Sequence, residues 1–141
     1  MPIQDKNTIE ALEDDYLYIQ PSQITNSGNG LFTAIKIYKD EIIAVFKGEI
    51  LSPTEIIKRE VKGEDKYFMV LLDGSVLDCM LTDCFAKYAN DASGLGKSSF
   101  VNNAKITLDD NGNVCLVATS TIKEHQEIFC SYGQKYWKKH K

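Results

Sequence analysis

No apolar run in this chain approaches the roughly 20 residues that a membrane-crossing helix needs. The chain has no Asn-x-Ser/Thr sequon, and its first fifteen residues are polar and acidic, the opposite of a secretory signal. These absences predict an intracellular protein, cytoplasmic or nuclear, with no membrane partner.

Cysteine and histidine are too sparse and too scattered for a zinc site. The cysteines form no CxxC pair, and no histidine stands at zinc-finger spacing, so we expect no metal. The two histidines, His125 and His140, lie in charged sequence, which argues against a Cys–His nucleophile. We predict four reduced thiols that pack as small hydrophobic side chains: Cys79, Cys84, Cys115 and Cys130.

Positive charge is also in short supply. The formal net charge is −4 and the pI is about 5.2, which argues against direct nucleic-acid binding and favours a basic partner such as a lysine-rich peptide. The lysines of residues 138–141 are predicted to form a solvated basic tail.

Short strands separated by turn residues dominate the rest of the chain. With 141 residues, it has the size of one domain. The helices of 10–15 residues that a parallel doubly wound sheet requires are absent. We predict a mainly β domain with short helices over residues 15–137, preceded by an N-terminal extension at 1–14. The expected strands are 17–19, 31–34, 42–46, 67–72, 76–79, 101–108, 114–119 and 127–131.

Three helical segments are expected among these strands. Ser52, Pro53 and Glu55 form a capping sequence that predicts a helix ending at Val61, before Gly63. A second helical stretch is expected over about Thr82 to Ala89, and a short turn over about Thr8 to Leu12.

Two glycine-containing turns resemble ligand loops in part. Gly28-Asn29-Gly30-Leu31-Phe32 lacks the third glycine and the following helix of a dinucleotide site. It is either a tight turn or a close backbone approach to another ligand. The stretch 109–113 lacks the oxygen ligands of a calcium loop and predicts a hairpin turn; 73–74 predicts another.

The C-terminal stretch leaves two interpretations open. A short strand leads into Tyr132 and Gly133, and Tyr136 and Trp137 follow. The aromatic residues could simply close the core. Alternatively, the phenol at the strand end could act on a bound substrate, beside a glycine that lets the backbone come close.

The order of the motifs resembles that of the SET domain family of S-adenosylmethionine-dependent protein lysine methyltransferases. The motifs that carry the resemblance, in chain order, are Gly-x-Gly-Leu-Phe at 28–32, Lys-Gly-Glu-Ile at 47–50, 67–78 ending in Leu-Asp, Asn90-Asp91, Asn102-Asn103 and the segment from Glu127-Ile128 to Tyr132-Gly133. The resemblance covers most of residues 15–137. It implies a β-clip fold with a C-terminal pseudoknot, which is one of the rare threaded connections.

The resemblance also implies roles for individual residues. Tyr132 is the expected catalytic residue, and Tyr67, Cys130 and Tyr132 are expected to line the channel for the substrate lysine. No metal is implied. The residues expected to bind S-adenosylmethionine are Gly28, Asn29, Gly30, Leu31, Phe32, Asn90, Asp91, Tyr136 and Trp137.

Three departures from the family pattern bear on activity. Asp91 stands where the family usually has histidine, in an Asn-His-Ser-Cys motif. Cys130 stands two residues before the catalytic position, where many members carry Phe or Tyr. Because cysteine is smaller than either, it leaves room for di- or trimethylation. Flanking zinc-binding segments are missing, so a possible homodimer could complete the substrate groove.

The substrate class is a basic, lysine-containing protein such as a histone. The alternative is a catalytically inactive SET-like domain that binds a basic peptide.

Overall fold

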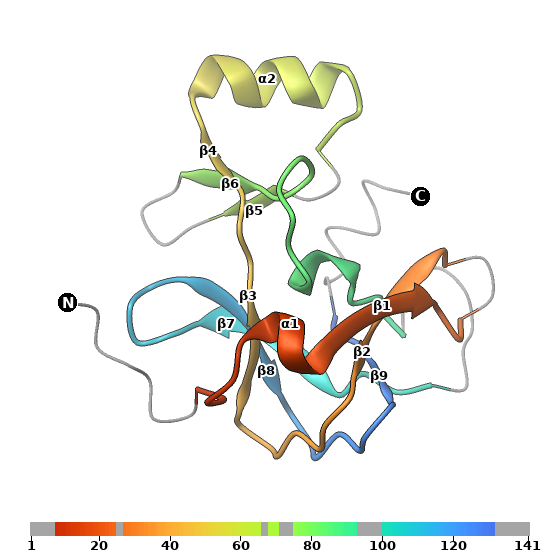
Figure 1. Ribbon diagram of the computed structural model, residues 1–141. Coiled ribbons are helices and arrows are strands. Elements are labelled where there is room, and N and C mark those ends of the chain that lie inside the picture. The colour runs from red at the N-terminus through yellow and green to blue at the C-terminus, as the bar shows by residue number, and fades with distance from the viewer. Residues whose placement is uncertain (1–7, 25–26, 66–67, 71–74, 93–99, 132–141) are drawn as a thin grey trace.

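The computed structural model describes residues 8–24, 27–65, 68–70, 75–92 and 100–131. In this part of the chain, short strands form three three-stranded sheets, accompanied by two α-helices and one 3-10 helix. Figure 1 shows α2 crossing above the β4–β6–β5 sheet, with the other two sheets below it. The predicted mainly β architecture with short helices is confirmed.

The first sheet joins the two halves of the chain. Its strands are β1 (Leu17–Pro21), β2 (Asn29–Thr33) and β9 (Glu127–Ile128), in the order β1-β2-β9 and all antiparallel. Leu31 is opposite Ile128, and both side chains are fully buried. Burial of these apolar residues on both sides of the pair fixes the register, since a shift by one residue would turn them to the opposite face.

The second sheet contains the predicted hairpin at 109–113. It has the order β3-β8-β7, with β3 at Ile42–Val45, β8 at Val114–Ala118 and β7 at Ala104–Leu108. In the turn, the Asp109 carboxylate accepts bonds from the backbone N–H groups two and four residues later, each at 2.9 Å. Gly112 has φ +81°, a conformation that glycine adopts without strain.

The third sheet carries α2 (Pro53–Val61). Its order is β4-β6-β5, with β4 at Glu49–Leu51, β6 at Val76–Asp78 and β5 at Phe68–Val70. The antiparallel register of β5 with β6 agrees with the predicted hairpin, whose turn at 73–74 lies outside the described residues.

The predicted ends of α2 are confirmed. The Ser52 side chain accepts a bond from the Glu55 N–H at 3.2 Å, which satisfies one of the open donors of the first turn. Gly63 follows the helix with φ +72°, as a glycine after a helix end often does.

The predicted helix over Thr82 to Ala89 is wrong. Only η1, a 3-10 turn at Ala86–Tyr88, forms there. The Lys87 ammonium instead donates to the preceding carbonyls, with Nζ 3.2 Å from the oxygens of residues 79 and 80 and 2.9 Å from that of Thr82. Three charge-assisted bonds hold these carbonyls in a loop around the ammonium, where they cannot serve a helix.

The predicted helical turn near Thr8 to Leu12 is also wrong. Thr8 forms a parallel bridge with Ile42, and the helix α1 comes later, at Glu13–Tyr16. The Tyr16 hydroxyl donates to the Ile43 carbonyl at 2.6 Å, so α1 is placed by its contact with β3.

The core lies where the first two sheets and η1 meet. Its largest fully buried apolar side chains, none of which exposes any surface, are Leu31, Ile37, Ile43, Leu116, Ile122 and Ile128. Cys130, two residues after β9, also belongs to this core.

Candidate functional site

Residues 129 and 130 run between two segments that come from opposite ends of one loop. Parallel bridges join Asn90 to Phe129 and Ala104 to Cys130. The Cys130 N–H donates to the Asn90 carbonyl at 2.9 Å, and the Ala104 N–H donates to the Phe129 carbonyl at 2.9 Å. This is the described part of the pseudoknot that the SET resemblance implies. The loop residues 93–99 lie outside the described residues.

Asn103 holds the same segment with its side chain. Its Oδ1 accepts a bond from the Phe129 N–H at 2.9 Å, and its Nδ2 donates to the Glu127 carbonyl at 3.0 Å. One amide thereby satisfies a donor and an acceptor of the crossing strand. The Asn102-Asn103 pair is one of the motifs that carry the resemblance, but nothing in its sequence indicates this role.

Asn90 also reaches the glycine loop, sixty-one residues away in sequence. Its Nδ2 donates to the Asn29 carbonyl at 3.0 Å. Gly28 has φ +63° and its carbonyl accepts a bond from the Ser22 N–H at 2.8 Å. The structure therefore brings together two of the segments that were predicted to bind the cofactor.

The five residues of the predicted glycine loop differ in exposure. Gly28 and Asn29 are exposed, and the Asn29 carbonyl is bonded to the Asn90 amide. Gly30 is buried, and the side chains of Leu31 and Phe32 are in the core, with strands on both sides. The exposed backbone that could meet a ligand is therefore at residues 28 and 29.

The buried carboxylate of Glu127 holds this loop in place. Glu127 is 2% exposed; its Oε2 accepts a bond from the Ser22 hydroxyl at 2.6 Å and its Oε1 one from the Gln23 N–H at 2.8 Å. Gly30 leaves the space that this carboxylate occupies. Charge-assisted bonds of this kind are stronger than neutral ones, so Glu127 sets the position of the turn that precedes β2.

Asp91, which stands at the position of the usual family histidine, is buried. Its Oδ1 accepts a bond from Asn102 Nδ2 at 3.0 Å, and the Asn102 Oδ1 accepts one from the Ala92 N–H at 2.8 Å. The carboxylate is therefore a part of the loop structure beside Asn90.

Cys130 contributes an uncharged thiol to the crossing. Its side chain is fully buried. Burial, together with the nearby Asp91 charge, raises the pKa of this thiol to about 12. It therefore remains protonated at neutral pH and behaves as a small apolar group.

Four predicted site residues lie outside the described residues: Tyr67, Tyr132, Tyr136 and Trp137. The described part of the site therefore consists of the glycine loop, the segment from Asn90 to Ala92 and the crossing strand.

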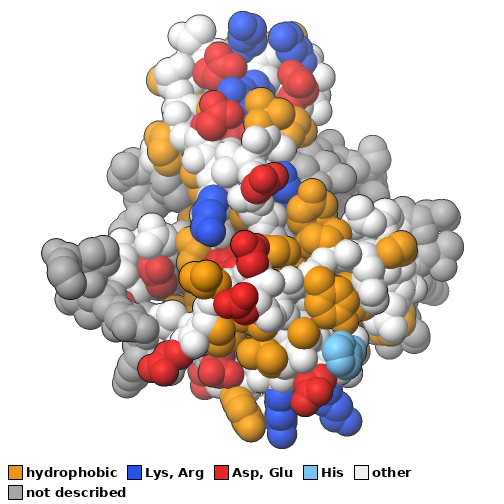
Figure 2. Space-filling view, in the orientation of Figure 1, with side chains coloured by type: hydrophobic (Ala, Val, Ile, Leu, Met, Phe, Trp, Pro, Cys, Tyr) orange, Lys and Arg blue, Asp and Glu red, His pale blue; other side chains and the backbone are white. Residues whose placement is uncertain are grey.

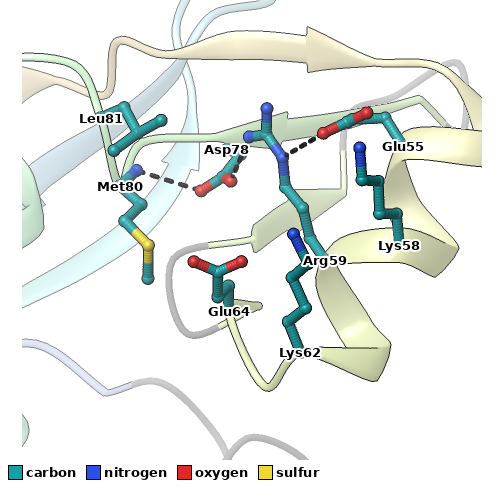
Figure 3. A pocket seen from close by; sticks show the side chains of 8 residues that line it. All are labelled: Glu55, Lys58, Arg59, Lys62, Glu64, Asp78, Met80 and Leu81. Carbon is teal, nitrogen blue, oxygen red and sulfur yellow. Dashed lines mark hydrogen bonds and ion pairs between the residues drawn. The ribbon is translucent and has the colours of Figure 1, made fainter.

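A separate hollow lies between α2 and the end of β6. Figure 3 shows Arg59 reaching from α2 to the carboxylates of Asp78 and Glu55, at 2.6 and 3.0 Å. Asp78, then Glu55 and Glu49, raise the pKa of Arg59 above its ordinary value. The residues lining this hollow are Glu55, Lys58, Arg59, Lys62, Glu64, Asp78, Met80 and Leu81.

Arg59 pairs with two of the carboxylates that line this hollow, those of Asp78 and Glu55. Figure 2 shows acidic and basic side chains intermixed over α2 at the top of the molecule. Arg59 anchors α2 to the third sheet, where Asp78 is 1% exposed. Among the residues that the structure describes, none of those predicted to bind cofactor or lysine lines the hollow.

The described residues contain neither a metal-binding cluster nor a membrane-spanning helix. No group of three or more His, Cys, Asp or Glu side chains there is arranged to hold a metal ion. No helix among the same residues has the length and apolar character to cross a membrane.

The family model of the SET domain matches residues 28–133. The chain therefore belongs to the SET domain family. It is 27% identical over 128 residues to the histone-lysine N-methyltransferase EZH2 of Chaetomium thermophilum, an alignment that covers 82% of this chain and 8% of that protein. The chain thus spans a small fraction of the relative's length.

Solved structures support the fold. A humanized mutant of the C. thermophilum Polycomb Repressive Complex 2 bound to the inhibitor GSK126 superposes with a TM-score of 0.68, at 24% identity, over 83% of this chain and 15% of that chain. The same complex in an autoinhibited conformation, bound to S-adenosylmethionine, gives 0.67 at 25% identity, over 84% and 15%. The predicted SET fold is confirmed.

Proposed function

We propose that this chain is an S-adenosylmethionine-dependent protein lysine methyltransferase. The observation that carries the proposal is the bond from Asn90 Nδ2 to the Asn29 carbonyl. It joins the glycine loop to the crossing strand, which leads to Tyr132. Membership of the SET domain family and similarity to a histone-lysine N-methyltransferase support the same chemistry.

The described part of the proposed cofactor site is the exposed start of the glycine loop and the Asn90 side chain bonded to it. The exposed backbone at Gly28 and Asn29 offers polar groups beside the Asn90 amide. A Cβ at Gly28 would meet nothing within 4 Å, so the loop leaves space for a ligand there. We assign cofactor binding to residues 28, 29, 90 and 91, and to the aromatic residues 136 and 137; Gly30, Leu31 and Phe32, which are buried, hold the loop in place.

When bound, S-adenosylmethionine supplies a methyl group on a positively charged sulfonium. The work left to the protein is alignment and exclusion of water, because the acceptor is a neutral amine. We assign Tyr132 to orient that amine, and Tyr67 and Cys130 to line its channel. The neutral, buried thiol of Cys130 is consistent with apolar surroundings that disfavour a lysine ammonium.

One observation favours the inactive, peptide-binding alternative. The Asp91 carboxylate is buried and its charge contributes to raising the pKa of Cys130. A negative charge at this place would likewise stabilise the ammonium form of a nearby lysine. That form binds well but cannot accept a methyl group.

Calorimetric titration with S-adenosylmethionine tests the cofactor site first. We expect micromolar binding that Asn90→Ala weakens by about tenfold or more, which corresponds to about 1.4 kcal/mol. Asn111→Ala, in the hairpin turn between β7 and β8, is the matched control and should bind like the wild type. Failure of the folded wild-type protein to bind would refute the proposed function.

Transfer of a labelled methyl group to histones separates enzyme from binding module. Tyr132→Phe is expected to abolish transfer while it leaves the cofactor affinity within a few-fold. Unchanged turnover of this variant would contradict the role assigned to Tyr132. Cofactor binding without transfer to any basic protein or lysine-rich peptide would favour the inactive alternative.

Several features stay predictions: the particular basic substrate, a nuclear or cytoplasmic location, the lack of direct nucleic-acid binding, and the homodimer. The relative's name specifies a histone lysine, so histones are the first substrates to test.

A further inference from the structure

The crossing strand is bonded on one side to the segment at residues 90–92 and on the other side to the segment at residues 102–104. These two outer segments are also bonded to each other. Asn102 Nδ2 donates to Asp91 Oδ1 at 3.0 Å, and Asn102 Oδ1 accepts a bond from the Ala92 N–H at 2.8 Å. The Asn102 side chain is therefore a direct link between the two segments that flank the crossing strand.

The acceptor of this link is a buried carboxylate. Asp91 is 8% exposed and Ala92 is 3% exposed. A buried charge is stable only when it is hydrogen-bonded, and a bond to a charged oxygen is stronger than one to a neutral oxygen. Removal of the Asn102 amide would take one charge-assisted bond from Asp91 and an acceptor from the Ala92 N–H.

The link lies next to the residue that joins the glycine loop. Asp91 directly follows Asn90, whose Nδ2 donates to the Asn29 carbonyl at 3.0 Å. The direction of that amide depends on the backbone of Asn90, which the bonds at residues 91 and 92 hold in place. Binding groups keep a productive geometry when hydrogen bonds from a second layer of residues fix them. Asn102 has this relation to the Asn90 amide.

The neighbouring asparagine holds a different part of the proposed site. Asn103 bonds the backbone of the crossing strand at two positions, and that strand leads to Tyr132. Asn102 instead bonds the segment that begins with Asn90. The two asparagines therefore support the predicted catalytic residue and the predicted cofactor residue separately.

We propose that Asn102 is a positioning residue of the cofactor site, and that its bonds to Asp91 and Ala92 hold Asn90 in the orientation that binds S-adenosylmethionine. Asp91, which stands where the family usually has histidine, is then the partner that Asn102 requires. This positioning role rests on the proposed function. The Asp91–Asn102 pair itself does not.

Exchange of the two side chains tests the pair. Asn102→Asp places a second carboxylate against that of Asp91, and like charges repel strongly in a buried environment. Adding Asp91→Asn restores one amide and one carboxylate. The amide at position 91 can donate to the carboxylate at position 102, which still accepts a bond from the Ala92 N–H. The double variant also has the net charge of the wild type.

Calorimetric titration with S-adenosylmethionine measures the effect on the cofactor site. We expect Asn102→Asp to weaken binding by about tenfold or more, and Asn102→Ala by about threefold to tenfold. The double variant should recover most of the loss caused by Asn102→Asp, because the two substitutions compensate each other. A double variant that binds no better than Asn102→Asp would overturn the pair.

Asn113→Asp is the matched control. Asn113 Nδ2 also donates to an aspartate, Asp109, at 3.3 Å, but on the exposed hairpin turn. Asn113→Asp therefore brings two carboxylates together far from the glycine loop in sequence, and it should bind the cofactor like the wild type. An equal loss of affinity in Asn113→Asp and Asn102→Asp would refute a specific role for Asn102.

The titration also separates positioning from a loss of folded protein. A variant that is only partly folded shows fewer binding sites with an unchanged affinity, whereas a displaced Asn90 lowers the affinity of every site. The proposal requires the second result, at a temperature below the Tm of each variant. Fewer sites at unchanged affinity would contradict the positioning role.

Hydrogen exchange followed by NMR tests the link without cofactor, and it decides if Asn102→Asp does not fold. The Ala92 amide should exchange slowly in the wild type and about tenfold or more faster in Asn102→Ala. The Ala118 amide, which donates to the Glu41 carbonyl at 3.0 Å, should keep its rate. Fast exchange at Ala92 in the wild type would overturn the link.

Failure of the positioning role and failure of the proposed function give different results. If the wild type binds S-adenosylmethionine and every Asn102 variant binds it equally well, the positioning role is refuted and the proposed function stands. If the folded wild type binds none, both fail. The Tm values then still decide on the pair, since Asn102→Asp should be the least stable variant and Asp91→Asn should rescue it.

Discussion

The carboxylate of Glu127 lies where a side chain on Gly30 would have to be. A Cβ built on Gly30 would overlap Oε2 of Glu127, lie 2.9 Å from its Cδ and come within 3.3 Å of the Ser22 Cα. Gly30 has no positive φ, so space rather than backbone conformation requires glycine here. Because Gly30 has no side chain, the buried Glu127 carboxylate of β9 can bond Ser22 and Gln23 and hold the turn before β2.

Gly30→Ala should therefore lower the free energy of unfolding by about 1–3 kcal/mol, because the displaced carboxylate loses its bonds to Ser22 and Gln23. Urea denaturation measures the change. Ser22→Ala removes one of these bonds, so Gly30→Ala should cost less in that background. Gly112→Ala, which adds only backbone strain at φ +81°, is the control and should cost the same in both backgrounds. If the Ser22→Ala background changed the cost of Gly30→Ala no more than it changed the cost of Gly112→Ala, the steric explanation would be contradicted.

The Arg59–Asp78 ion pair should be needed to hold α2 on the third sheet. Arg59→Met keeps an apolar stem but leaves the Asp78 carboxylate buried without its counter-charge, which is strongly unfavourable. We expect a fall in Tm of several degrees. Asp78→Asn in the Arg59→Met background removes the buried charge and should recover part of the loss. Lys58→Met on the same helix should change Tm little, and an equal effect of the two methionine variants would argue against the pair.

Glu13 should make stability depend on pH. Burial raises the pKa of Glu13 above its ordinary value of 4.5, although the Val45 N–H bond and the Lys47 charge oppose this. The folded state thus keeps the Glu13 proton to higher pH than the unfolded chain does. The contribution of Glu13 to stability is complete when the pH is below about 4.5, and it is lost as the pH rises through the pKa of the folded state.

Glu13→Gln keeps a side-chain acceptor for the Val45 N–H without the charge. Its stability relative to the wild type should be greatest at neutral pH and should decline as the pH falls toward 4.5, as followed by denaturation over that range. Glu13→Ala, which loses the acceptor as well, should be less stable than Glu13→Gln at every pH. A difference that is constant with pH would refute the role of the charge.

Cys130 should determine how many methyl groups are added, if the proposed function holds. The family position two residues before Tyr132 often carries a large aromatic residue, and Cys130 is smaller. We expect dimethyl or trimethyl product from the wild type and predominantly monomethyl product from Cys130→Phe, distinguished by mass spectrometry of the substrate at exhaustive turnover. If the wild type yielded monomethyl lysine and no higher product, this prediction would be contradicted.

Local chemistry made much of the fold predictable. The Ser52 cap, Pro53 and Gly63 set both ends of α2 through contacts within a few residues. The Asp109 carboxylate and Gly112 likewise form their turn from neighbouring atoms. The order of the motifs indicated the family, which the match to residues 28–133 confirms.

Residues far apart in sequence decided the rest. The sequence by itself indicated most of the strands, the turn at 109–113 and α2, because propensities, caps and turn geometries act over a few residues. It did not indicate β4, which forms by pairing with β6. Only the tertiary structure decided that Lys87 would replace a helix by a loop, that Glu127 would lie against Gly30, and that Asn90 would donate to the Asn29 carbonyl. These groups are polar or titratable, and their burial is favourable only once the folded chain brings their partners to them.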